Sequence, residues 1–224
     1  MSAIQKYHDE KVSLRIAVAM LGARRHYAVP AALQSVGLLQ HFFTDAIATQ
    51  GWPRVLKLFN KKQLPKALQR LAGRVPNGVP VAKITSHPTF GLSYSYRLSR
   101  AKTLDESLEI FTWAGKAFAS SIKRNGLHNA NAIYTFDRCG MELMTLAKAN
   151  GIKTIMDQTV APFRTDQTII RSEENKYPTW GGGETATPVY EQLFTAREEA
   201  EWALADIILC PSDYVKETII QCGG

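Results

Sequence analysis

The chain has 224 residues, of which 45% are hydrophobic and 9% aromatic, so it can bury a substantial core and is not expected to be disordered. Its net charge is +7, and it contains three cysteines without paired spacing, which argues against a disulfide framework or a zinc site and favours a reducing, cytoplasmic compartment. No apolar run approaches the roughly 18 residues of a membrane span, and the polar start lacks a signal-peptide core. We expect residues 1–13 to form a tail and residues 14–224 to form one domain.

The positive charge belongs to one segment. Residues 46–104 contain eleven Lys or Arg and no acid, whereas the rest of the chain has 16 basic and 20 acidic residues. A local patch of this kind attracts phosphates, either those of lipid headgroups or those of nucleic acid.

The first half of the chain begins with a predicted strand at 14–20, a helix that starts near Pro30 and a second strand at 41–47. Residues 51–74 then form a basic insertion, predicted as two short amphipathic helices divided at Pro65. The apolar faces of these two helices comprise Val55, Leu58 and Phe59, and Leu64, Leu68 and Leu71. Residues 75–91 are rich in turn formers and are predicted to be irregular.

The second half opens with a capping box at Thr103–Glu106, which predicts a long helix ending near Gly126. A strand at 131–136, a helix at 137–151 and a strand at 152–157 form a βαβ unit, which requires a parallel sheet. An irregular segment, a helix at 187–205, a strand at 206–210 and a helix capped by Ser212 follow. The predicted fold class is α/β, a Rossmann-like, doubly wound and mostly parallel sheet.

The loop after the first strand, Gly22–Tyr27, contains Arg24, Arg25 and His26 beside the start of a helix. This arrangement suits an anionic group, although a solvated basic loop is the alternative. The loop has one glycine and lacks Gly-x-Gly-x-x-Gly, which argues against a nicotinamide site.

Asp157 and Gln158 follow a strand at the same predicted sheet edge. A carboxylate there can orient a sugar hydroxyl or act as a base, the alternative being a simple cap. Because parallel strands bring their following loops to one edge, Arg24, His26 and Asp157 are predicted to converge. Asp137 is predicted as a helix N-cap. The histidines lack ligand spacing, so no metal is expected.

Three segments together resemble a known family. The stretches "MLGARRHYAVPAAL", "YTFD…LAKANGIKTIMDQTVAP" and "REEAEWALADIILCPSDYVKETIIQCG" are similar to the amino-terminal half of family 4 glycosyltransferases of the GT-B fold. The last stretch is the most specific, and the resemblance runs from about Leu14 to Gly223. In that family the first domain holds the acceptor and the second binds the nucleotide-sugar, commonly through Glu-x7-Glu. Transfer usually retains the anomeric configuration and needs no metal.

The resemblance implies an acceptor-binding domain that helps to move a sugar from a nucleotide-sugar donor to a glycan or lipid-linked acceptor, without a cofactor. Gly22, Arg24, Arg25 and Gln158 would contact the acceptor or a phosphate. Asp157 occupies the strand end where many members place a catalytic His-Asp or similar group; no histidine is present there, and His26 is the candidate to supply the imidazole.

The resemblance also implies a second domain, which is expected to be absent from this chain. Glu191 and Glu199 have seven residues between them but lie on the acceptor side, so they are not expected to be the donor pair. The chain alone is therefore expected to fold without transferring sugar.

Two other classes remain open. One is a Rossmann-type nucleotide-binding epimerase or oxidoreductase, which the poor glycine pattern disfavours. The other is a non-catalytic module that binds membrane or nucleic acid through residues 46–104; no recognition motif supports nucleic acid.

The insertion at 51–74 is predicted to dock on an anionic membrane, as in a peripheral protein of the inner membrane face. The alternative is a helical pair packed on the domain with its basic face in water. The residues predicted to face the membrane are Arg54, Lys57, Lys61, Lys62, Lys66 and Arg70.

Overall fold

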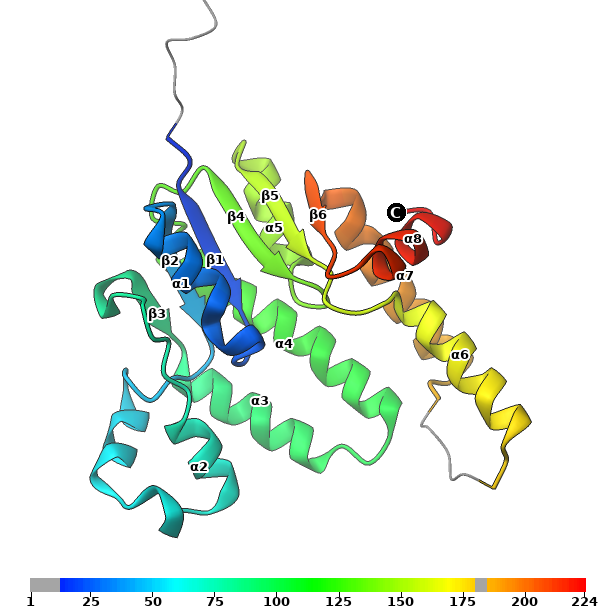
Figure 1. The fold of residues 1–224 in the computed structure, drawn as a ribbon, viewed down its shortest axis with the longest axis horizontal. Coiled ribbons are helices and arrows are strands. Elements are labelled where there is room, and N and C mark those ends of the chain that lie inside the picture. The colour runs from blue at the N-terminus through cyan, green and yellow to red at the C-terminus, as the bar shows by residue number, and fades with distance from the viewer. Residues whose placement is uncertain (1–12, 180–184) are drawn as a thin grey trace, which may run out of the picture.

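A computed structural model describes residues 13–179 and 185–224 (Figure 1). They form a six-stranded sheet in the order β3-β2-β1-β4-β5-β6, and every neighbouring pair is parallel. The strands are β1 (Ile16–Met20), β2 (Leu39–Thr44), β3 (Ile84–Ser86), β4 (Ala132–Phe136), β5 (Lys153–Asp157) and β6 (Ile207–Leu209). This order is that of a doubly wound Rossmann-like fold, in which the strand order reverses between β1 and β4. The predicted fold class is therefore confirmed.

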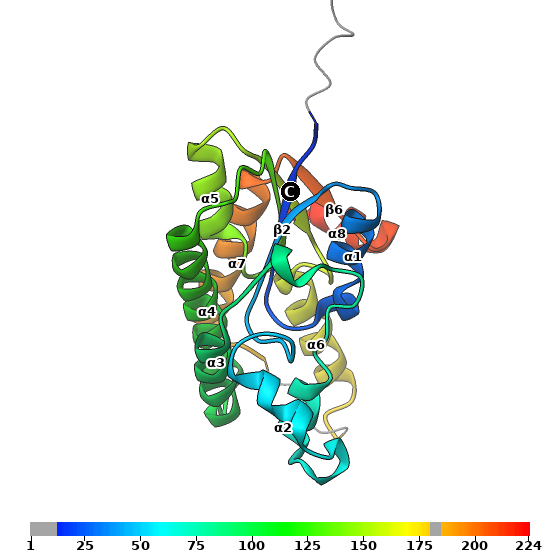
Figure 2. The same cartoon turned by 90° about the vertical axis from the view of Figure 1, so that its left-hand side faces the viewer.

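Helices cover both faces of the sheet. Viewed along the sheet, α4, α5 and α7 lie on one side, and α1 and α8 lie on the other (Figure 2). The helices are α1 (Ala28–Ser35), α2 (Lys66–Ala72), α3 (Pro88–Arg100), α4 (Leu104–Asn125), α5 (Met141–Ala149), α6 (Phe163–Lys176), α7 (Pro188–Leu204) and α8 (Asp213–Gln221). Short 3-10 turns form η2 (Arg24–Tyr27), η3 (Trp52–Leu58), η4 (Lys61–Gln63) and η5 (Val81–Lys83).

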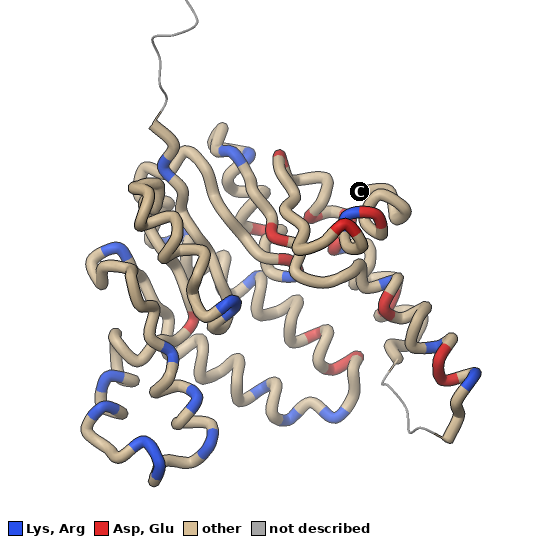
Figure 3. Tube along the Cα trace, viewed as in Figure 1, with Lys and Arg blue, Asp and Glu red and all other residues tan. Residues whose placement is uncertain are grey.

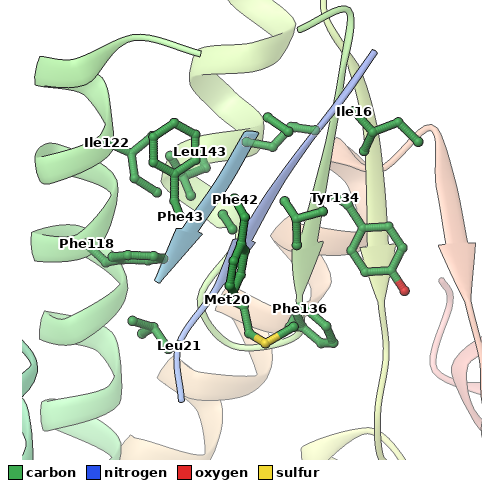
Figure 4. Close-up of a cluster of buried hydrophobic side chains, with 14 of the residues drawn as sticks. Ile16, Met20, Leu21, Phe42, Phe43, Phe118, Ile122, Tyr134, Phe136 and Leu143 are labelled. Atoms are coloured by element: carbon green, nitrogen blue, oxygen red, sulfur yellow. The ribbon is translucent and has the colours of Figure 1, made fainter. Parts of the chain in front are cut away.

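The core lies between the central strands and α4. All five residues of β1 and of β4 are buried, as expected for strands that helices cover on both faces. Phe118 and Ile122 of α4 project toward Phe43 of β2 (Figure 4), and all three side chains are fully buried. This packing belongs to a cluster that also includes β1 and β4, and it holds α4 against the central strands.

The predicted helix caps are confirmed at two positions. The Thr103 hydroxyl accepts the N–H of Glu106 and begins α4, and the Ser212 hydroxyl accepts the N–H of Val215 and begins α8. The third prediction, Asp137, is wrong, because α5 begins only at Met141 and Gly140 holds the N-cap position. The Asp137 carboxylate is instead engaged in an ion pair.

Three segments differ from the sequence-based expectation. The stretch predicted to be irregular at 75–91 contains β3 and the start of α3, and the irregular segment after Asp157 contains α6. The first amphipathic helix of the insertion is replaced by η3 and η4, because Pro53 and the Asn60 side chain, which accepts the N–H of Lys62, favour short turns. Only α2 is an α-helix in this region.

Candidate functional site

Three buried aspartates lie at the carboxyl edge of the sheet. Asp45 follows β2, Asp137 follows β4 and Asp157 is the last residue of β5, and each is at most 2% exposed. Each carboxylate is paired with an arginine: Arg74 with Asp45 at 2.7 Å, Arg24 with Asp137 at 2.7 Å, and Arg25 with Asp157 at 2.8 Å. Buried carboxylates without such partners would be strongly destabilised. The three pairs therefore lie along the edge of the sheet where doubly wound folds bind ligands.

Arg24 crosses the point where the strand order reverses. From the turn after β1 its Nη1 donates to Asp137 Oδ1 at 2.7 Å and to the Thr159 hydroxyl at 3.2 Å. Its guanidinium also lies 5.4 Å from the centre of the Phe136 ring. The space between the loops that follow β1 and β4 is thus bridged by a side chain.

Asp157 is bonded through both of its oxygens. Oδ1 accepts Arg25 Nη2, and Oδ2 accepts the Tyr134 hydroxyl at 2.7 Å. Burial, together with this hydrogen bond, raises the pKa of Tyr134 well above its ordinary value, so the phenol stays protonated and remains a donor. The Asp157 carboxylate can bond the hydroxyl group of a ligand only if the Arg25 side chain, which is 44% exposed, moves away from it.

An unusual backbone turn begins at Arg25, directly after Arg24. Arg25, His26 and Tyr27 have φ values of 47°, 50° and 65°, which is one turn of left-handed helix without a glycine. Left-handed residues of this kind each cost about 1–2 kcal/mol. The bonds of Arg24 and Arg25, and the burial of Tyr27, hold the turn in place. Strain that the surrounding structure over-determines is found most often at functional sites.

The helix preceding β6 organises the neighbouring loops. Glu201 of α7 is fully buried and accepts the N–H groups of Arg138, Gly140 and Met141 at the start of α5. Burial raises its pKa to about 7, against the opposing effect of these bonds. Glu198 likewise accepts the N–H of Phe163 after β5. Glu198 and Glu201 of α7 therefore hold the loops that follow β4 and β5 in place at the carboxyl edge.

The structure brings together only part of the predicted site. Of the three residues predicted to converge, Arg24 and Asp157 lie at the carboxyl edge, and Asp157 pairs there with Arg25, which the convergence prediction did not include. Gln158 is fully buried, where its amide bonds Trp202, Glu198 and the carbonyl of Val160, so this geometry gives no support to an acceptor contact. Gly22 has a φ of 76° and donates its N–H to Asp45.

His26 points elsewhere. It is exposed and lines a separate hollow with residues of the basic insertion, so nothing brings its ring to Asp157. The imidazole predicted to stand in for the missing histidine is therefore not beside the carboxylate in this structure.

Sequence reasoning missed Asp45 and misassigned Asp137. A signal for both was present, because "FFTD", "YTFD" and "TIMD" each close a buried strand with an aspartate. Since the carboxyl ends of parallel strands share one edge, three such endings predict one acidic cluster.

Glu191 and Glu199 lie on α7 and are held in ion pairs with α6. Glu191 pairs with Arg171 and Glu199 with Arg164, both on α6, so neither is free as a donor-binding pair. Within residues 13–179 and 185–224, no group of three His, Cys, Asp or Glu side chains is placed to hold a metal ion.

The basic insertion lies below the sheet in Figure 3, where Lys and Arg gather around α2 with no acidic residue of their own segment. Its apolar side chains at Leu58 and Phe59 are 83% and 57% exposed. Leu56, which is outside the predicted face, packs inward at 7% exposure. None of the described helices is both long and apolar enough to cross a bilayer.

The fold and this edge define the class as a Rossmann-like α/β protein. Neither the protein-family models nor the curated proteins compared with this chain give a match.

Proposed function

We propose that this chain is the acceptor-side domain of a glycosyltransferase, which helps to transfer a sugar from a nucleotide-sugar to a glycan or lipid-linked acceptor. The observation that carries the proposal is the paired edge formed by Arg24, Arg25, Asp137 and Asp157. Carboxylates and guanidinium groups are suited to hydroxyl and phosphate groups. The resemblance of three sequence segments to family 4 glycosyltransferases supports the same function.

The same edge disfavours the alternative of an epimerase or oxidoreductase. A dinucleotide in a doubly wound sheet lies across the crevice at the reversal point, with its diphosphate on a glycine-rich turn. Here Arg24 bridges that crevice to Asp137, and the turn contains one glycine followed by bulky residues. A dinucleotide would have to displace the ion pair.

The proposed roles follow from the contacts. Asp157 orients an acceptor hydroxyl once Arg25 swings toward the ligand, and the freed Arg25 neutralises developing phosphate charge. Tyr134 holds the second oxygen of Asp157 and acts as a positioning residue. Arg24 keeps the loops after β1 and β4 together.

The proposal includes peripheral attachment to an anionic membrane on the cytoplasmic side. It is supported by Leu58 and Phe59, which are exposed beside the lysines of the insertion. Exposed apolar side chains flanked by cations are typical of interfacial segments.

The test is transfer of a radiolabelled sugar by the protein that carries this chain. UDP-glucose, UDP-N-acetylglucosamine and GDP-mannose are offered with a lipid extract and with soluble glycans. We expect label in one acceptor fraction, dependent on a single donor. Saturable binding of NAD or NADP, with no transfer from any of the donors, contradicts the proposal in favour of the oxidoreductase class.

A further inference from the structure

A basic hollow lies between the turn after β1 and the helix α2. It has a volume of about 600 Å³, and its lining includes His26, Lys61, Lys66, Arg70 and Arg74. No acidic side chain is among the described residues that line it. The hollow therefore places His26, from the turn after β1, beside four cations of the insertion.

The charges in the hollow are largely uncompensated. Arg74 is paired with Asp45, whereas Lys61, Lys66 and Arg70 form no ion pair within the described part of the chain. A Cβ added at Gly73 would come within 3.4 Å of the Lys61 ammonium, so the bare glycine leaves Lys61 room beside the end of α2. A concave surface lined by charges of one sign concentrates counter-ions of the other sign.

We propose that this hollow binds a phosphate or diphosphate group, and, resting on the proposed function, that the group belongs to the acceptor. Lys and Arg are the side chains that recognise phosphate, as point charges and as planar forks respectively.

The hollow is joined to the aspartate edge. Asp45 accepts both the N–H of Gly22 and the guanidinium of Arg74, and His26 directly follows Arg25, which holds Asp157. A phosphate in the hollow would thus hold its attached group beside the carboxylates.

Only some of the residues that the sequence predicts to face a membrane line the hollow. Lys61, Lys66 and Arg70 line the hollow, whereas Lys57 and Lys62 do not, although all five are exposed on the same segment. The chain thereby supplies a matched control: two of the cations that line the hollow, Lys66 and Arg70, can be compared with the two outside it, Lys57 and Lys62.

The experiment is a calorimetric titration of the 224-residue chain with inorganic diphosphate at low and moderate salt. The double variant Lys66→Ala, Arg70→Ala is compared with Lys57→Ala, Lys62→Ala, which removes the same charge. Alanine favours a helix, and both hollow residues are exposed, so α2 is expected to persist, as circular dichroism will verify. We expect the hollow variant to bind at least about tenfold more weakly, and the control to change less than about twofold.

Vesicles of phosphatidylcholine with phosphatidylglycerol separate the two sources of phosphate. Both variants lose two cations, so both are expected to bind vesicles less tightly than the wild type. If the hollow variant loses diphosphate binding but its vesicle binding falls no further than that of the control, the phosphate is carried by a soluble ligand. If its vesicle binding falls at least about tenfold further than that of the control, the phosphate is a lipid headgroup. Either result supports the site.

Absent diphosphate binding, or an equal loss in both variants, overturns the site in favour of diffuse attraction. The titration needs no sugar transfer, so a failed transferase assay with a positive titration refutes only the proposed function.

Discussion

Arg25 reaches from the turn after β1 to the end of β5, where its Nη2 lies 2.8 Å from Oδ1 of Asp157, 132 positions later in the chain. Arg24, its neighbour in sequence, turns to Asp137 at the end of β4. Two adjacent side chains therefore fasten two different strands to one turn. They can do so because the left-handed backbone at Arg25 separates their directions.

Replacing Asp157 with Asn is expected to lower sugar transfer by more than about tenfold, since acid–base and orienting groups contribute about 10²–10⁴ to rate. The measurement is kcat and KM for sugar transfer, with the donor and acceptor that the transfer assay identifies. Asp206→Asn is the matched control, because Asp206 is also ion-paired, with Lys148 at 2.7 Å, but precedes β6 at the opposite edge. If the two variants differ only in stability and turn over normally, Asp157 is purely structural.

The ion pair of Arg24 and Asp137 is expected to be strongly coupled. Arg24→Met leaves a buried carboxylate whose remaining neighbours are Thr159 and, at 3.6 Å, Arg138, and should cost about 2–4 kcal/mol in the free energy of unfolding. Adding Asp137→Asn should restore part of that loss, with a coupling energy of about 1–3 kcal/mol in urea unfolding.

The control for this cycle is the exposed pair of Arg164 and Glu199, where the coupling should stay below about 1 kcal/mol. Equal coupling energies for the two pairs would show that the burial of Asp137 does not strengthen its interaction with Arg24.

Stability should fall in mild acid because of His41. Burial, with a contribution from the stacked His128 ring at 3.8 Å, lowers the pKa of His41 to about 4. The unfolded chain binds this proton at about pH 6.5, so between pH 6.5 and pH 4 the unfolded state holds more protons than the folded state. The stabilisation is present above this window and is lost as the pH falls through it, on the order of 2–3 kcal/mol.

The measurement is urea unfolding at several pH values between 7 and 4. His41→Gln keeps a partner for the Thr85 hydroxyl but does not titrate, so its stability should depend less on pH. If the free energy of unfolding of His41→Gln depends on pH as steeply as that of the wild type, His41 is not the source of the pH dependence.

Attachment to membranes is expected to depend on both charge and the exposed apolar side chains. The wild type should sediment with vesicles containing phosphatidylglycerol and not with neutral vesicles, since each cation contributes about 1 kcal/mol at an anionic surface. Leu58→Ser with Phe59→Ser should weaken this binding by at least about tenfold and leave stability within about 0.5 kcal/mol, because both side chains are exposed.

Val189→Ser with Leu193→Ser, at comparably exposed positions on α7, is the matched control and should bind normally. Equal sedimentation with neutral and anionic vesicles, or none with either, would exclude docking by the insertion.

Much of the fold could be predicted from local patterns. The strands β1, β4 and β5 were recognised by their apolar runs, and α4 and α8 by their caps, within two residues of the observed bounds. By contrast, α3 and α6 were missed, because neither begins with a side-chain cap: His87 and Pro162 hold their N-cap positions without a side-chain hydrogen bond. Their positions are set by packing, α3 against α4 and α6 against α7.

By itself, the sequence determined the alternation of strands and helices, the parallel sheet and the edge at which its loops meet, because periodicity, caps and crossover handedness are local rules. Only the tertiary structure decided which arginine faces which aspartate, that Gln158 is buried, and that His26 turns away from Asp157. The reason is energetic. A left-handed turn at Arg25, His26 and Tyr27 opposes the intrinsic preference of each residue, and it exists because contacts more than a hundred positions away hold it.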